Sequence, residues 1–265
     1  MLRGVDVSGW QPDFEPASIS CDFVIVKATG GTGYTNPCFV QQCEKTLAAG
    51  KLLGIYHFAG DGMGGSAKAE AEHFLNAFSR YKGRAIPILD WEAEATSWPI
   101  EWARIWLDMV ADKTGAVPWF YSYASYVQNH DCRCIARYPL WIAAYYAGYQ
   151  PMGWQTNPPR YGGTGSWSAP ICYQYTSSGQ VGYRSNLDLN IFYGTAKDWK
   201  DYCKEEDDMS DAYDFLAAKT DASGRGKKAD VRERLAFMAA KQEQMQSELS
   251  QLKAKLDRII KKLGA

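Results

Sequence analysis

The sequence has 265 residues, of which 46% are hydrophobic and 14% aromatic, so it suits one large barrel or two smaller domains with a complete core. It contains no run of about 18 apolar residues, and no membrane-spanning helix is therefore predicted. The formal net charge is −1, but the charges are unevenly distributed. Residues 225–265 hold 11 basic and 5 acidic residues, whereas residues 1–224 hold 18 basic and 25 acidic residues. By its net negative charge, the segment 1–224 is not a nucleic-acid binder.

Predicted strands and helices alternate along the first 203 residues. Strands are predicted at residues 4–8, 22–28, 52–58, 85–92, 117–121, 139–145, 170–175 and 181–192, where the last range holds one or two strands. Helices are predicted at residues 39–49, 67–81, 101–114, 124–129 and 196–203. Repeated strand–helix units indicate parallel pairing, and about eight strands predict a closed TIM-like (β/α) barrel. The glycine- and proline-rich residues 148–165 predict an irregular last third.

The stretch at residues 85–92 begins apolar and ends in two acids, as a buried parallel strand does where it reaches its carboxyl end. Side chains two apart on a strand share a face, so Asp90 and Glu92 are predicted to point the same way and Trp91 the other way. Two neighbouring carboxyl groups repel, so one pKa is expected to rise and the other to stay low. A pair of carboxyl groups of this kind suits glycoside hydrolysis. Two solvated acids at a strand end, without any catalytic role, would give the same sequence pattern.

Two further acids fall at predicted strand ends. Asp6 lies near the end of the first strand and Asp188 lies in the last. Barrel enzymes carry their chemistry at the carboxyl ends of their strands, so we expect these acids to meet Asp90 and Glu92 at one mouth.

Cofactor and metal sites are not predicted. The glycines at residues 30–33 lack the Lys-Ser/Thr pair of a phosphate loop, and His130, Cys132 and Cys134 lack a second ligand pair at zinc spacing. The cysteine count is odd and residues 1–6 show no signal peptide, so reduced thiols are expected.

Several motifs, in order and at matching spacing, resemble those of the glycoside hydrolase family 25 muramidases, the Chalaropsis-type lysozymes. They are Gly-Val-Asp-Val-Ser at residues 4–8 with Gln11, Ile-Leu-Asp-Trp-Glu at 88–92, Leu-Trp-Ile-Ala at 140–143, Tyr-Gln-Tyr at 173–175 and Leu-Asp-Leu-Asn at 187–190. The resemblance covers about residues 1–203. It implies a TIM-like barrel with a modified last third, and cleavage of the β-1,4 bond between N-acetylmuramic acid and N-acetylglucosamine in peptidoglycan, without metal or cofactor.

The resemblance also implies roles for the acids. Glu92 would be the general acid/base and Asp90 the nucleophile or stabiliser, with Asp6 and Asp188 orienting the pair. In related enzymes the 2-acetamido group of the substrate attacks with help from the acid at the position of Asp90, and both routes stay open. Retention implies carboxyl groups about 5 Å apart if a direct nucleophile operates. Substrate-binding candidates, for which core packing is an equal alternative, are Tyr34, Tyr56, Tyr121, Trp141, Tyr145 and Gln174. Lys27 and Phe58 look structural, although a lysine at a strand end could contact the acids.

The residues after the barrel divide into two parts. Residues 204–228 are predicted to be a charged linker with a short helix. Residues 229–265 are predicted to form a coiled-coil helix, because apolar residues recur at steps of four and three from Leu235 to Leu263. The chain is therefore expected to be a homo-oligomer through residues 231–263, a trimer or tetramer rather than a dimer, although an amphipathic helix packed on the barrel has a similar pattern.

The leading functional prediction is a phage or prophage endolysin, made in the host cytoplasm without a signal peptide and released through a holin to lyse the cell wall. Its partner would be the glycan strands of peptidoglycan. The alternatives are a non-catalytic wall-binding or virion structural protein on the same fold, and a chitinase-like hydrolase. Met209 could start a separate tail-only product.

Overall fold

The computed structural model describes residues 1–159 and 162–204. Its strands are β1 (Leu2–Val7), β2 (Phe23–Gly30), β3 (Tyr34–Thr35), β4 (Leu52–Phe58), β5 (Ala85–Asp90), β6 (Trp119–Tyr123), β7 (Leu140–Ala143), β8 (Cys172–Gly179) and β9 (Leu187–Phe192). Its α-helices are α1 (Phe39–Ala48), α2 (Ala67–Phe78), α3 (Glu101–Thr114), α4 (Ala124–Asn129) and α5 (Ala196–Tyr202). Three short 3₁₀ helices are η1 (Pro16–Ser18), η2 (Ser79–Tyr81) and η3 (Ala93–Ser97). The predicted coiled coil and linker lie outside the described residues.

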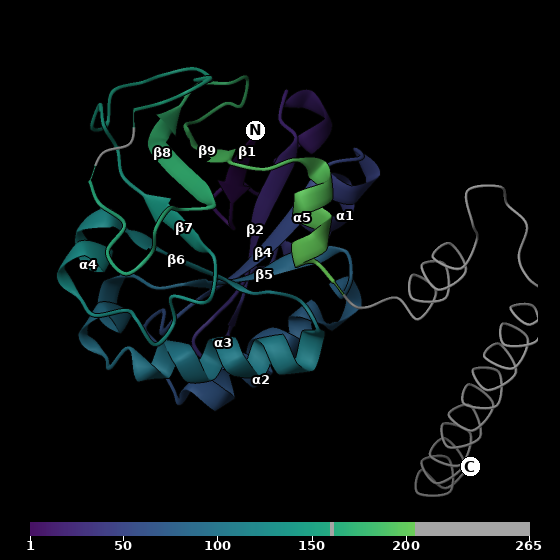
Figure 1. Cartoon of the computed structure of the whole chain (residues 1–265). Coiled ribbons are helices and arrows are strands. Elements are labelled where there is room, and N and C mark those ends of the chain that lie inside the picture. Colours follow the sequence, from purple (N-terminus) through teal and green to yellow (C-terminus); the bar gives the residue numbers. More distant parts are fainter. Residues whose placement is uncertain (160–161, 205–265) are drawn as a thin grey trace, which may run out of the picture. The chain divides into compact units, whose positions relative to one another are not determined.

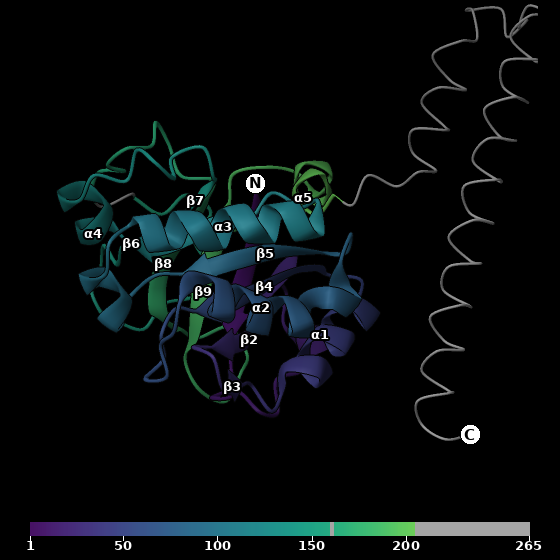
Figure 2. The ribbon, with the colours of Figure 1, turned by 90° about the horizontal axis from the view of Figure 1, so that it is seen from below.

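The strands form a closed barrel. Their order is β1-β9-β8-β7-β6-β5-β4-β2, with β3 at the outer edge of β2, and the pairing of β1 with β2 closes the ring. The predicted closed (β/α) barrel is therefore confirmed. Helices α1, α2 and α3 cover the outside of β2, β4 and β5, with α2 and α3 side by side (Figures 1 and 2). No helix lies between β7 and β8 among the described residues, which confirms the irregular last third.

The direction of β9 differs from the prediction of repeated parallel units. β9 runs antiparallel to both β8 and β1. Only residues 180–186 connect β8 to β9, and a parallel crossover needs a dozen or more residues, so the chain turns back as a hairpin instead. Asp188 therefore lies at the start of its strand and not at the carboxyl end. Because β9 is reversed, its start still meets the carboxyl end of β1.

The core has two layers, as alternating side chains require. Inside the barrel, residues such as Ile25, Ile88 and Trp119 form one buried cluster, and Trp199 of α5 packs into it against Phe23 and Trp119. The second cluster lies between the barrel and its helices. Phe23 and Trp119 begin their strands, so α5 covers the amino-terminal end of the barrel and the acids lie at the opposite end.

Candidate active site

A cavity of about 170 Å³ lies at the carboxyl ends of the parallel strands. All four predicted acids line it, together with five of the six predicted substrate-binding residues. The lining is Asp6, Tyr56, Asp90, Glu92, Tyr121, Trp141, Tyr145, Gln174 and Asp188. The structure therefore brings together residues that are up to 182 positions apart in the chain, from Asp6 to Asp188. The sixth candidate, Tyr34, lies in a separate hollow with Trp10 and Lys27.

Asp90 and Glu92 reach this cavity from the end of β5. β5 ends at Asp90, and Glu92 lies in the extended residue that precedes η3. Trp91, between them, is fully buried in the outer layer against Trp98 and Trp102, and its backbone N–H donates to the carbonyl oxygen of Tyr121 over 2.9 Å. Anchoring Trp91 outside the barrel leaves its two acidic neighbours on the cavity side.

The pKa values of both acids are raised. Burial raises the pKa of Asp90 well above its usual range, the charge of Glu92 raises it further, and the charge of Lys27 opposes the shift. Burial and then the charge of Asp6 raise the pKa of Glu92, and Lys27 again opposes. The prediction that one of the two pKa values would stay low is wrong, because burial acts on both groups. Oδ1 of Asp90 is buried and has no hydrogen-bond partner among the described residues.

Asp6 and Asp188 form a second acidic pair, as register partners across β1 and β9. Oδ1 of Asp6 accepts from Nδ2 of Asn190 over 2.7 Å and from Nε2 of Gln174 over 2.9 Å. Burial raises the pKa of Asp6, and these hydrogen bonds oppose the shift. Burial, followed by the charge of Asp6, raises the pKa of Asp188 well above its usual range. The protonated form is therefore favoured more strongly for Asp188 than for Asp6.

Three aromatic side chains orient the two amides that donate to Asp6. The hydroxyls of Tyr121 and Tyr145 donate to Oε1 of Gln174 over 2.9 and 2.8 Å, which aims the amide nitrogen of Gln174 at Asp6. Nε1 of Trp141 donates to Oδ1 of Asn190 over 2.9 Å. Asn190 was not among the predicted site residues, although it belongs to the Leu-Asp-Leu-Asn motif at residues 187–190. Its position two residues after Asp188, on the same face of the strand, was the available signal.

Lys27, which the sequence suggested to be structural, also acts on the acids through its charge. It is a charged residue near the end of an otherwise apolar strand, and its side chain is only 13% exposed. Nζ lies 2.9 Å from Oδ2 of Asp61 and over the rings of Phe58 and Tyr34. A buried ammonium is costly unless it is paired, so Asp61 stabilises a positive charge close to Asp90 and Glu92.

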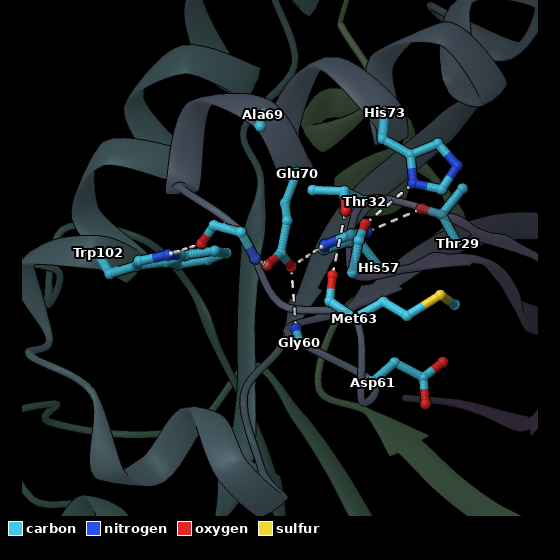
Figure 3. Close-up of polar contacts among 12 residues, drawn as sticks. Thr29, Thr32, His57, Gly60, Asp61, Met63, Ala69, Glu70, His73 and Trp102 are labelled. Carbon is cyan, nitrogen blue, oxygen red and sulfur yellow. Dashed lines mark hydrogen bonds and ion pairs between the residues drawn. The ribbon is translucent and has the colours of Figure 1, made fainter.

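A buried network holds the loop that carries Asp61 (Figure 3). One carboxylate, that of Glu70 on α2, accepts from the backbone N–H groups of Gly60 and Gly65 over 2.9 and 2.7 Å. It also lies 2.9 Å from Nε2 of fully buried His57. Burial lowers the pKa of His57 despite this carboxylate, so its neutral form is favoured. The network holds residues 60–65 in the turn that places Asp61, whose φ of +50° is in the left-handed region.

Within the described residues, no group of three or more His, Cys, Asp or Glu side chains is placed to hold a metal ion. The seven cysteines, all of which lie in that part of the chain, are free thiols. A search of the same residues finds no helix with the length and apolar character that crossing a membrane requires.

A closed (β/α) barrel with four acids gathered in one cavity, at the end where the parallel strands finish, is typical of barrel glycoside hydrolases. The sequence pattern of the Glycosyl hydrolases family 25 matches residues 5–183, so the chain belongs to that family, as its ordered motifs predicted.

Individual relatives agree with this assignment. The chain is 33% identical over 177 residues to the N,O-diacetylmuramidase of Chalaropsis sp, a match that covers 58% of this chain and 83% of the relative. The bacterial lysozyme of Streptomyces coelicolor shares the fold, with a TM-score of 0.62 at 24% identity over 76% of this chain and 96% of that one. The CTP1L endolysin matches with a TM-score of 0.57 at 25% identity over 83% of this chain and 79% of its own.

Proposed function

We propose that the protein is a muramidase that hydrolyses the β-1,4 bond between N-acetylmuramic acid and N-acetylglucosamine in peptidoglycan. The observation that carries this function is the convergence of Asp6, Asp90, Glu92 and Asp188 in one cavity at the barrel mouth. The relative from Chalaropsis is named for muramidase activity, and the structural relative from Streptomyces coelicolor is a lysozyme.

Glu92 acts as the general acid. Its raised pKa keeps the proton on the carboxyl group above the usual range of a glutamate, so that it can protonate the leaving glycosidic oxygen. After the first product leaves, the carboxylate of Glu92 takes a proton from the attacking water.

Asp90 acts on the sugar cation. Its unpartnered buried oxygen is available either to attack the anomeric carbon or to hold the acetamido group of the substrate while that group attacks. Either route needs the ionised form of Asp90. Burial and the charge of Glu92 oppose that form, and the positive charge of Lys27 favours it. Asp6, held by Gln174 and Asn190, orients the sugar beside this pair together with its strand neighbour Asp188.

The test is clearing of a Gram-positive cell-wall suspension by the protein and by Glu92→Gln. Removing a general acid costs about a hundredfold or more in rate, so the variant should leave the suspension turbid. Glu72→Gln is the matched control, because Glu72 is an exposed acid on α2. Equal clearing by the wild type and Glu92→Gln would show that Glu92 is not the general acid. No clearing by either of these two proteins would favour a wall-binding protein.

Mass spectrometry of the soluble fragments identifies the bond that is cut. New reducing ends should carry N-acetylmuramic acid. Reducing-end N-acetylglucosamine from walls would contradict the proposed bond, and its release from chitin would favour a chitinase-like enzyme.

The biological role in this proposal is that of a phage endolysin, made in the host cytoplasm and released to the wall through a holin. The likeness to the CTP1L endolysin supports it. Expression in a susceptible host should be tolerated until the membrane is permeabilised and should then cause lysis within minutes. Lysis without permeabilisation would contradict a holin-dependent role.

Residues 229–265 make the enzyme an oligomer in the same proposal, on the strength of their heptad pattern. Several linked barrels would engage the wall at once and gain avidity. Sedimentation of the full chain should give a trimer or tetramer and that of a chain ending at Ala222 a monomer, whereas two monomers would refute the idea.

A second, shorter product of the same gene is a further part of this proposal. The crystal structure of the CTP1L endolysin reveals how the activity of that enzyme is regulated by a secondary translation product. In this chain Met209 is the candidate start of such a product. Intact-mass measurement of the expressed protein should show a second species that Met209→Leu removes.

A further inference from the structure

Trp10, in the turn after β1, is an unusual surface residue. Its side chain is 87% exposed, the largest value among the large hydrophobic side chains of the described residues. Burial of a tryptophan side chain is strongly favourable, so a tryptophan displayed to solvent gives up a large stabilisation. Exposed aromatic residues of this kind are enriched where a protein binds a partner or ligand.

The turn that carries Trp10 is rigid. The backbone N–H of Ser8 donates to Oε1 of Gln11 over 3.0 Å, and the N–H of Gln11 donates to the carbonyl oxygen of Ser8 over 3.2 Å. From α1, Nε2 of Gln42 donates to the carbonyl oxygens of Ser8 and Gln11 over 2.8 and 2.9 Å. Gln42 is 1% exposed, and a satisfied buried amide is a strong and rigid support. The display of Trp10 is therefore a built feature of the fold.

Trp10 borders a hollow of about 410 Å³. Its lining combines two aromatic rings with an ammonium, a carboxylate and a hydroxyl, from Trp10, Tyr34, Lys27, Asp61 and Ser8. A sugar ring has an apolar C–H face and a polar hydroxyl edge, and a site with flat aromatic faces and a few fixed polar groups complements both.

The hollow and the acid cavity are neighbours. Lys27 borders the hollow and is the register partner of Tyr56 on β4, which lines the acid cavity. Strands lie about 4.8 Å apart, so these two residues separate the two spaces.

On the other side, the acid cavity shares Glu92, Tyr121 and Tyr145 with a hollow of about 490 Å³ that extends to Tyr149. The acids therefore lie between two larger hollows. A polymer that is cut at an internal bond needs space for its sugars on both sides of that bond.

We propose that Trp10, Tyr34 and Lys27 form a distal sugar subsite, in which an N-acetylhexosamine of the bound glycan strand stacks on Trp10 away from the bond that is cleaved. This inference rests on the proposed function and deepens it. In this proposal Trp10 recognises long glycan strands, and the acids in the neighbouring cavity cleave the glycosidic bond.

The test uses the full chain and peptide-free glycan strands fractionated by length. Trp10→Ala should raise KM about tenfold on long strands and leave kcat unchanged, because the lost contact binds ground state and transition state alike. On the shortest strands that are cleaved the variant should match the wild type, because those strands do not reach the hollow. Trp10→Phe should recover part of the loss, since a smaller aromatic face remains. Val40→Ala, an exposed apolar residue on α1 that does not line the hollow, is the matched control.

Calorimetry separates a failure of the subsite from a failure of the proposed function. Long strands should bind Glu92→Gln about tenfold more tightly than the double variant Trp10→Ala/Glu92→Gln, whether or not the wild type cleaves them. Equal affinity, or a KM change of the same size at every strand length, would overturn the subsite. Sedimentation gives the other decisive outcome: an oligomer that Trp10→Ala dissociates would assign Trp10 to contact between copies of the chain.

Discussion

Asp6 and Asp188 are neighbours across the antiparallel pair β1–β9, and a hydrogen bond joins their side chains. Because Oδ1 of Asp6 already accepts from Gln174 and Asn190, Asp6 is the acceptor of the pair and Asp188 the proton donor. Two acids that share one proton carry one negative charge instead of two, which is how both stand side by side in a cavity that also holds Asp90 and Glu92.

This pairing predicts that two substitutions of Asp188 differ in their effect on activity. Asp188→Asn keeps a donor in place of the acidic proton and should reduce kcat/KM by less than about tenfold. Asp188→Leu removes the donor to a buried charged acceptor, an interaction worth about 1.5–3 kcal/mol, and should cost about 10- to 100-fold. Steady-state rates on soluble glycan strands measure both. Equal losses in the two variants would show that the charge of Asp188 matters and its proton does not.

Lys27 and Asp61 should move the pH profile in opposite directions. The charge of Lys27 lowers the pKa values of Asp90 and Glu92, so Lys27→Met should shift both limbs of the kcat/KM profile to higher pH. The charge of Asp61 raises the pKa of Asp90, so Asp61→Asn should shift the acid limb to lower pH. The profiles of the two variants, measured at constant ionic strength, check this. Shifts in the same direction would mean that loop displacement outweighs charge.

The acid cluster should make the protein less stable as the pH rises. The pKa values of Asp6, Asp90, Glu92 and Asp188 are raised on folding, so the folded state binds more protons than the unfolded chain. The stability they contribute is fully present below the unfolded pKa values, 3.8 for the aspartates and 4.5 for Glu92, and is lost as the pH rises through the raised values. Asp90→Asn removes one of these groups and should therefore make the free energy of unfolding depend less steeply on pH. Urea unfolding between pH 4 and pH 8 measures it, and parallel curves for variant and wild type would contradict it.

The buried carboxylate beneath the Asp61 loop should matter for stability and activity together. Glu70→Gln replaces an acceptor that faces three donors, at Gly60, Gly65 and His57, by an amide that must turn its own N–H groups toward some of them. We expect a loss of about 1–3 kcal/mol in the free energy of unfolding and a lower kcat. Glu72→Gln, two residues along the same helix and exposed, should change neither. Thermal unfolding and wall clearing of both variants give the comparison.

Local patterns in the sequence were sufficient for much of the fold. β4 and α3 have the predicted bounds. The apolar run of β4 lies between Gly50 and Gly60, and the helical apolar spacing of α3 ends at Gly115. The acids near strand ends at Asp6, Asp90 and Glu92 could be located in the same way, since each interrupts an apolar run. The family could also be predicted, because it rests on the order of short motifs.

Only the tertiary structure decided how these parts act on one another. The reversal of β9 depends on the length of the connection after β8, and it turned Asp188 from a strand end into the partner of Asp6. The raised pKa values of Asp90 and Glu92, the charge of Lys27 beside them and the place of Tyr34 outside the acid cavity depend on groups brought together from distant segments. A sequence pattern reports the periodicity of one segment. Burial and charge coupling are sums over neighbours from all segments, and they exist only once the barrel has closed.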